Sequence, residues 1–321
     1  MKISYKIAVL LAVIPSVLLG QRTKKESDPN KVQFITADIP RFWAAFDSCK
    51  VDPKNSVAIF NTLYFAPGSM GLKKLDEVDI KGAENLVLAV DKYHAFYESV
   101  RPQTMRLKTL EPEIRKSLTR FKNIYPKAQF PPVYFLIGKL NAGGKSEKDG
   151  LLIGAELVCA DSTSNTENMI PSFQKLLKAN VFSNILLTIV HEQVHYQQSN
   201  SDAAHENTLL AYAIREGSAD FIAGMIVGEN KKKPAFIYGE QHEKELWDQF
   251  KTDMEGFDIN KWMYNAGTEE KPSDLGYYVG YKIVQAYYKG SSNKKQAIDD
   301  ILNIKDFRAS LKQSGYAAKF N

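Results

Sequence analysis

Two histidines and a glutamate stand at the spacing of a metal-binding helix in the run His191-Glu192-Gln193-Val194-His195. Residues four apart on a helix share a face, so both imidazoles can reach one metal ion while Glu192 points toward the same opening. The pentapeptide alone is only moderately specific, because five residues with two free positions recur by chance in unrelated proteins. The neighbouring sequence therefore has to decide between a site and an accidental match.

The segment that leads into this run predicts a buried helix. Apolar residues recur there at three- and four-residue spacing, at Val181, Phe182, Ile185, Leu186, Ile189 and Val190. This spacing is typical of a helix with an apolar face. Histidines that project from such a helix fit a buried zinc site, and two of the chain's five histidines fall in the run.

A third ligand is predicted 21 residues after His195, at Glu216. This distance leaves room for a turn and a returning helix. Asp220, four residues later on the same helical face, could accept the free N–H of a ligand histidine and fix its tautomer. Two histidines and one glutamate leave one coordination position open, as in thermolysin-like zinc enzymes.

His205 is the alternative third ligand. In the metzincin pattern a third histidine follows six residues after the second, with a glycine between them. Here Ser201 occupies that position and Gln198 precedes it, so the pattern fails. We expect His205, ten residues after His195, to be a surface or capping residue.

The first twenty residues predict a secretory signal. Lys2 and Lys6 precede an apolar core of 13 residues from Ile7 to Leu19, and Gly20 offers a small residue for cleavage before Gln21. The core is too short to span a bilayer. We therefore expect an exported protein, periplasmic or secreted, without a stable membrane anchor; a retained signal that serves as an anchor is the alternative.

The composition excludes other classes of partner. The net charge of +5 falls to +3 without Lys2 and Lys6, which is too little to indicate nucleic acid. Charged residues at 25% and apolar residues at 44% are ordinary for a globular protein. Cys49 and Cys159 make no disulfide scaffold, and we expect two buried free thiols rather than a bridge.

The elements that must position these residues predict a mainly helical α+β fold, with a small sheet before the histidine helix. Residues 21–125 are expected to be helical, with helices at Arg41–Cys49, at Glu84–Val100 and from Pro112 to Pro126. Residues 126–321 are expected to form the catalytic region, integrated with the N-terminal part into one domain. It begins with strands at 133–137 and 151–158.

Two further roles are predicted within the catalytic region. Residues 151–158 are expected to be the edge strand that pairs with an extended substrate, with Glu156 facing either solvent or a substrate amine. A helix that begins near Ser273 or Asp274 carries Tyr277 and Tyr281, either of which could donate to the substrate oxyanion or merely pack.

Several of these segments resemble one protein family. They are Tyr134–Gly138, Gly150–Glu156, His191–Tyr196, Glu216–Asp220 and Gly276–Val284. The family is that of predicted zinc-dependent proteases related to the gliding-motility lipoprotein GldB, common in Bacteroidetes. The resemblance implies a zincin-like fold, Zn²⁺ held by His191, His195 and Glu216, and Glu192 as general base. Gln21 stands where a lipoprotein has its cysteine, so tethering and a gliding role do not follow from it.

The sequence thus predicts an exported zinc metallopeptidase that acts on a peptide or protein. Three alternatives remain at this point. One is a degenerate site that keeps the motif without activity, and a second is a non-catalytic envelope protein that uses the same fold for binding or assembly. The third is a zinc hydrolase of non-peptide amides.

Overall fold

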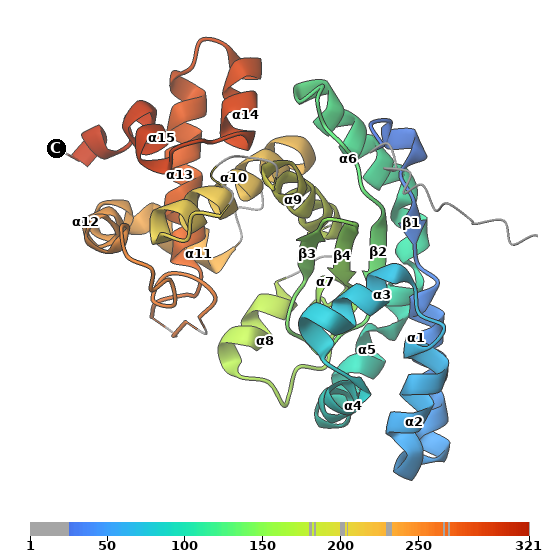
Figure 1. Cartoon of the computed structure of the whole chain (residues 1–321). Coiled ribbons are helices and arrows are strands. Elements are labelled where there is room, and N and C mark those ends of the chain that lie inside the picture. Colours follow the sequence, from blue (N-terminus) through green and yellow to red (C-terminus); the bar gives the residue numbers. More distant parts are fainter. Residues whose placement is uncertain are drawn as a thin grey trace, which may run out of the picture.

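Helices surround one small sheet in this protein, which confirms the mainly helical α+β class (Figure 1). The computed structural model describes residues 26–320, except 180–181, 183, 200–202, 204, 229–232, 266 and 269. The predicted export signal lies outside the described residues. No helix among the described residues is long and apolar enough to cross a membrane.

The N-terminal part is helical, as predicted. Its helices are α1 (Asp38–Val51), α2 (Ser56–Phe60), α3 (Met70–Leu75), α4 (Ala83–Lys92), α5 (His94–Met105) and α6 (Glu111–Ile124). Short 3-10 or π turns are η1 (Pro29–Lys31), η2 (Pro53–Asn55), η3 (Asn61–Phe65), η4 (Asp76–Ile80) and η5 (Leu107–Leu110). The single helix expected over Glu84–Val100 is wrong, because the chain leaves helical geometry at Tyr93 (φ −119°, ψ 31°).

The sheet has four strands in the order β1-β2-β4-β3. Their bounds are β1 (Phe34–Ile35), β2 (Val133–Leu136), β3 (Gly144–Glu147) and β4 (Gly150–Gly154). β1, β2 and β4 run parallel, whereas β3 pairs antiparallel with β4. Every residue of β4 is buried, as is typical of a strand covered on both faces.

The expected edge strand over 151–158 is wrong in two respects. β4 lies between β2 and β3, so it is an inner strand, and the edge strand beside it is β3, with β1 at the other edge of the sheet. The strand also stops at Gly154, because β2 ends at the partner residue Leu136. Residues 155–158 then form the short helix α7 (Ala155–Val158), which places Glu156 in the interior instead of on the strand surface.

Glu156 is a buried carboxyl group, with 1% of the residue exposed. Its Oε1 atom accepts the backbone N–H of Leu140 at 3.3 Å, whereas its buried Oε2 atom has no hydrogen-bond partner. Burial raises the pKa of Glu156 to about 7, although backbone N–H groups oppose this shift. The side chain is therefore mostly protonated in mildly acidic solution and about half protonated near pH 7.

We expect the substitution Glu156→Gln to stabilise the protein above pH 7. The folded-state pKa is raised, so the stability of the unsubstituted protein is fully present below the unfolded pKa and is lost as the pH rises through about 7. A difference between about 4.5 and about 7 corresponds to roughly 3 kcal/mol at most. Glutamine keeps an oxygen atom that can accept the backbone N–H of Leu140, and its side chain carries no charge.

Urea unfolding at pH 4.5 and pH 8, with a chelator present, measures this effect. The two proteins should differ little at pH 4.5 and most at pH 8. The exposed Glu113 on α6 provides a control, because Glu113→Gln should leave the pH dependence unchanged. A stability difference that is the same at both pH values contradicts a titrating Glu156.

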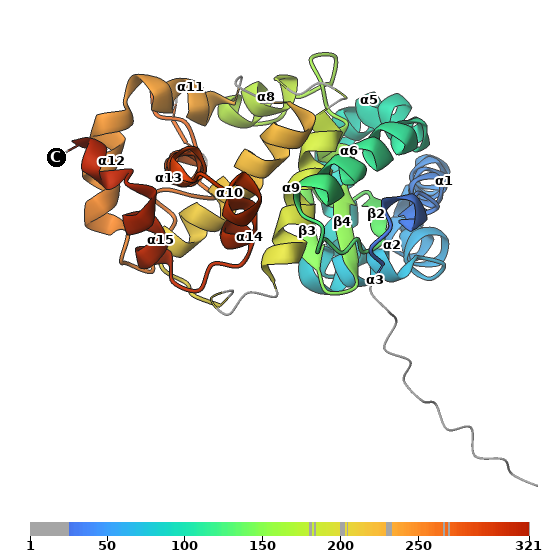
Figure 2. The same ribbon diagram turned by 90° about the horizontal axis from the view of Figure 1, so that it is seen from above.

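The C-terminal half is mainly helical. After α8 (Pro171–Lys178) come α9 (Asn184–Gln198), α10 (Leu209–Val227), α11 (Pro234–Gln241), α12 (Glu243–Asp253), α13 (Leu275–Gly290), α14 (Lys294–Leu302), α15 (Phe307–Ser314) and η6 (Ala317–Phe320). Helix α9 contacts β3 and β4 on one side and α10 on the other, so it joins the sheet to the C-terminal helices (Figure 2).

Glycines let α10 and α13 approach closely. A Cβ atom at Gly217 would lie 2.1 Å from the backbone of Gly280, and one at Gly280 would lie 1.7 Å from the carbonyl oxygen of Ala213. This contact fixes α10, and therefore Glu216, relative to the rest of the molecule.

The two cysteines are free thiols, as predicted, but only Cys159 is buried, whereas Cys49 is half-buried. Burial raises the pKa of both Cys49 and Cys159. We therefore expect neither thiol to be a reactive thiolate.

Candidate metal centre

Three side chains converge between α9 and α10. The Nε2 atoms of His191 and His195 lie 3.0 Å apart. The Oε2 atom of Glu216 lies 3.1 Å from the first nitrogen and 3.2 Å from the second. The residues of the pentapeptide and the predicted third ligand are therefore brought together, and they form a group that could hold a metal ion.

The hydrogen bonds behind the two imidazoles fix which nitrogen faces the centre. Nδ1 of His191 lies 3.0 Å from Oδ1 of Asp220, and Nδ1 of His195 lies 2.9 Å from Oε1 of Gln198. Both oxygens accept hydrogen bonds, so each Nδ1 carries a proton and donates it. In the neutral imidazoles the Nε2 lone pairs consequently point at each other and at Glu216.

Two residues hold these acceptors in turn. Lys233 donates to both carboxylate oxygens of Asp220, at 2.8 and 2.9 Å. Nε2 of Gln198 donates to the carbonyl oxygen of Arg215 at 3.3 Å. Such partners orient metal-ligating histidines in known sites, and the role predicted for Asp220 matches this geometry.

The charges in the centre favour a cation. Burial lowers the pKa of a histidine, but the hydrogen bonds of His191 with Asp220 and Glu216 outweigh burial and raise its pKa to about 10. Burial opposes the ionisation of Glu216, yet the two histidines hold the pKa of Glu216 well below its usual range. A positive charge, either a proton or a metal ion, is thus stabilised where the three ligand atoms meet.

The donor set and spacing fit zinc. Bond lengths near 2.0–2.1 Å in a tetrahedral zinc site put ligand atoms about 3.3 Å apart. The three observed separations are 3.0, 3.1 and 3.2 Å. Two imidazoles and one carboxylate also leave a fourth position for water or substrate, as catalytic rather than structural zinc sites do.

Glu192 lies between this centre and the edge strand. It is only 7% exposed, and burial raises the pKa of its carboxyl group. A Cβ atom at Gly144 on β3 would lie 2.5 Å from Oε1 of Glu192. The carboxyl group therefore fits against the strand only because residue 144 is glycine.

A tyrosine that the sequence did not single out touches the centre. The hydroxyl of Tyr264 donates to Oε1 of Glu216 at 2.8 Å. The backbone N–H of Tyr264 is held by Asp274 at 2.7 Å, in a left-handed conformation with φ 57°. Asp274 therefore holds the Tyr264 loop instead of capping α13 through its side chain.

The two tyrosines named from the sequence differ in position. The ring of Tyr277 stacks on His191 at 6.4 Å and meets Tyr264 edge-on at 6.2 Å. Tyr281 packs against Phe221 and Phe236, and its hydroxyl accepts a hydrogen bond from Gln285. The structure therefore brings Tyr277 to the candidate metal ligands and uses Tyr281 in helix packing.

His205 is exposed, as expected for the weaker candidate. Among the described residues, the group of potential metal ligands consists of His191, His195 and Glu216. The geometry thus favours Glu216 as the third ligand.

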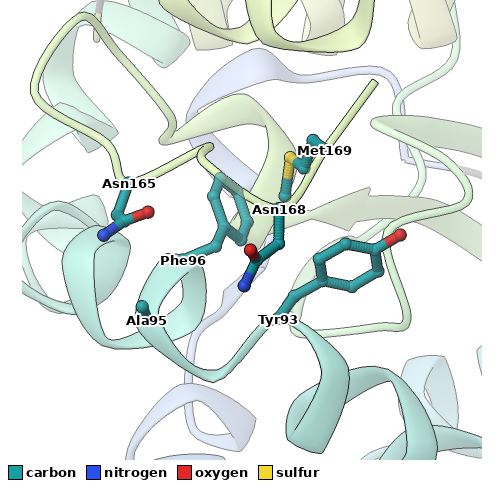
Figure 3. Close-up of a pocket in the computed structure, with 6 residues that line it drawn as sticks. All are labelled: Tyr93, Ala95, Phe96, Asn165, Asn168 and Met169. Atoms are coloured by element: carbon teal, nitrogen blue, oxygen red, sulfur yellow. The ribbon is translucent and has the colours of Figure 1, made fainter. Parts of the chain in front are cut away.

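A small recess on another face of the protein does not compete with this site (Figure 3). It is lined by Tyr93, Ala95, Phe96, Asn165, Asn168 and Met169. Its volume of about 10 Å³ has room for a single water molecule. We assign it no function.

Comparison with known proteins identifies the family of this chain. No curated protein and no solved structure matches the chain. The family model described as gliding motility protein GldB matches residues 22–318, nearly the whole chain. The chain therefore belongs to the GldB gliding motility protein family.

Proposed function

We propose that this protein is a zinc-dependent metallopeptidase with a zincin-like catalytic region that works in the cell envelope. The observation that carries the proposal is the triangle of His191 Nε2, His195 Nε2 and Glu216 Oε2, with edges of 3.0–3.2 Å. A buried carboxyl group, Glu192, adjoins it. A metal site with structural duties only has no need of that group.

The residues of the site divide the chemistry among them. Zinc held by His191, His195 and Glu216 would lower the pKa of a bound water to about 7 and would polarise the substrate carbonyl. Glu192 accepts the proton of the attacking water and passes it to the leaving amine. Its burial serves this exchange, because the raised pKa brings the carboxyl group closer to the working pH.

The edge strand supports a peptide as substrate. β3 ends the sheet order, so its outer side can pair with an extended chain through backbone hydrogen bonds. Gly144 belongs to β3 and meets Glu192. A peptide added to this edge would run past the general base, Glu192. We predicted this pairing role for residues 151–158 from the sequence.

Chelator-sensitive hydrolysis tests the proposal. The zinc-loaded protein is incubated with a peptide library and with denatured casein, and products are identified by mass spectrometry. We expect cleavage that stops with a zinc chelator and returns when zinc is restored. A zinc-loaded, folded protein that cleaves neither substrate contradicts the proposal.

The family description favours a second candidate, a non-catalytic component of the gliding apparatus. Such a protein would use the fold and its metal for binding or assembly. Glu192 separates the candidates, because a binding module gains nothing from a buried base beside the metal. Its substitution should therefore alter a peptidase and leave a scaffold unaffected.

Tyr264 should strengthen the metal site through Glu216. We expect Tyr264→Phe to weaken zinc binding by about 10–100-fold, the usual effect of losing a residue that orients a ligand. The reason is the lost hydrogen bond of 2.8 Å to Oε1 of Glu216. Competition with a chromogenic chelator measures the zinc affinity.

The control is Tyr238→Phe, since the ring of Tyr238 stacks on His242 and takes no part in the centre. A Tyr264→Phe protein with unchanged zinc affinity and a lower turnover would mean that the hydroxyl acts on the substrate instead. If both the zinc affinity and the turnover stay unchanged, the Tyr264 hydroxyl has no role in zinc binding or in catalysis.

We also propose that the protein is exported. The predicted signal and a cleavage before Gln21 would release the mature protein without an acylated cysteine. Membership in a gliding-motility family supports an envelope location. There the substrates would be exported or surface proteins.

A further inference from the structure

The side chain of Arg215 is partly buried, and one of its donor atoms has no partner among the described residues. Its Nη1 atom is buried and makes no hydrogen bond. Among the described residues no carboxylate forms an ion pair with it, whereas Arg101 makes two hydrogen bonds of 2.7 Å to Asp47. A buried donor without a partner is costly, and more so on a charged group.

The nearby acidic groups already have partners. Glu216 accepts from Tyr264 and faces the two histidines. Glu206 accepts from Thr208 at 2.8 Å and pairs with Arg308 at 3.6 Å. Neither of these two carboxylates therefore forms an ion pair with Arg215.

Aromatic rings hold the guanidinium in place. Its central carbon lies 4.7 Å from the ring centre of Tyr212 and 5.5 Å from that of Phe307. Cation–π contacts of this kind orient an arginine without using its N–H donors. The two rings thus fix the position of the planar guanidinium group, while its Nη1 atom makes no hydrogen bond.

Arg215 also lies beside the metal centre. It directly precedes Glu216 on α10, and its carbonyl oxygen accepts from Gln198, the residue that holds His195. Burial, the largest effect on the guanidinium, lowers its pKa, whereas the nearby carboxylates of Glu216 and Glu206 act in the opposite direction. A substrate bound at the metal would therefore have a cationic fork within its reach.

We propose that Arg215 binds a carboxylate group of the substrate next to the scissile bond. A guanidinium fork matches a carboxylate in two parallel hydrogen bonds. In a peptide this group is either the C-terminal carboxylate or the side chain of an aspartate or glutamate. The proposal rests on the proposed peptidase function and names the substrate class: peptides that carry a negative charge beside the bond that is cut.

Matched peptides test the proposal on the zinc-loaded, full-length protein. Each octapeptide is made with a free C-terminus and as the C-terminal amide, and internal glutamates are exchanged for glutamine. Mass spectrometry gives kcat/KM for each pair. We expect one exchange to lower kcat/KM by about 10–100-fold, the scale of a hydrogen bond to a charged group, and the sensitive exchange identifies the source of the carboxylate.

Variants connect this preference to Arg215. Arg215→Met should abolish the preference within each pair, and Arg215→Lys should keep part of it, because lysine retains the charge without the fork. Arg308→Met is the control, since Arg308 is half-exposed and paired with Glu255; it should keep the full preference. Zinc content and thermal unfolding establish that each variant is folded and loaded.

The outcomes distinguish the two proposals. If the wild-type protein cleaves no peptide, the peptidase proposal fails. Calorimetry with the Glu192→Gln protein can still detect stronger binding of carboxylate than of amide peptides, which would support the Arg215 site alone. If the protein cleaves both members of every pair at the same rate, or if Arg215→Met keeps the preference, the Arg215 site is wrong and the peptidase proposal stands.

Discussion

The substitution Glu192→Gln should leave the protein folded and zinc-loaded while turnover falls by two to four orders of magnitude. Glutamine has nearly the same shape as glutamate and removes no metal ligand, so the triangle of His191, His195 and Glu216 stays intact. It cannot accept a proton at neutral pH, and losing a general base typically costs about 10²–10⁴ in rate. Single-turnover rates on the best library peptide, with zinc content from elemental analysis, give both quantities.

The matched control is Glu113→Gln, which makes the same chemical change at an exposed position of α6. It should leave both turnover and zinc content unchanged. If Glu192→Gln cleaves peptides at the wild-type rate, Glu192 is not the base. If that variant instead loses its zinc, the carboxyl group holds the site together rather than acting on the substrate.

The sequence predicted that the two histidines lie together because helical geometry is local. Residues four apart share a face whatever the rest of the fold does, so the pairing of His191 with His195 needed no tertiary information. The match of Asp220 with His191 also followed from spacing, once Glu216 was taken as a ligand. Each of these spacings is fixed within a single helix, α9 for the two histidines and α10 for Glu216 and Asp220.

Residues that reach the site from distant segments were missed. Tyr264 lies 48 residues from Glu216 along the chain, in a loop that no periodic pattern marks. Gln198 was noted only as a departure from another pattern, although it holds His195. Neither residue type is distinctive, so only the folded arrangement identifies these two.

The wrong prediction of an edge strand over residues 151–158 has a related cause. Residues 151–158 are buried without interruption, and a continuous apolar run does not distinguish a strand from a buried helix. The length of β4 is set by β2, its partner. The polar β3, whose four residues are all only partly buried, carried no apolar alternation that would have indicated a strand.

Zinc binding should depend on Glu216 and His195 and not on His205. We expect about one Zn²⁺ per wild-type chain, and both Glu216→Ala and His195→Ala should lose most of it. Each change removes one of three ligand atoms that lie 3.0–3.2 Å apart. Elemental analysis after dialysis against buffer of low zinc content measures the loss.

His205→Ala is the matched control, because it removes an imidazole that is exposed and separate from the centre. It should keep its zinc. Zinc at 100 times its dissociation constant should also stabilise the wild-type and His205→Ala proteins by about 2.7 kcal/mol, and should do so much less in the two ligand variants. Well-folded wild-type protein that binds no zinc would refute the metal centre. Retention of zinc by Glu216→Ala together with its loss from His205→Ala would show that the third ligand is His205, in spite of the hydrogen bonds that hold Glu216 beside both histidines.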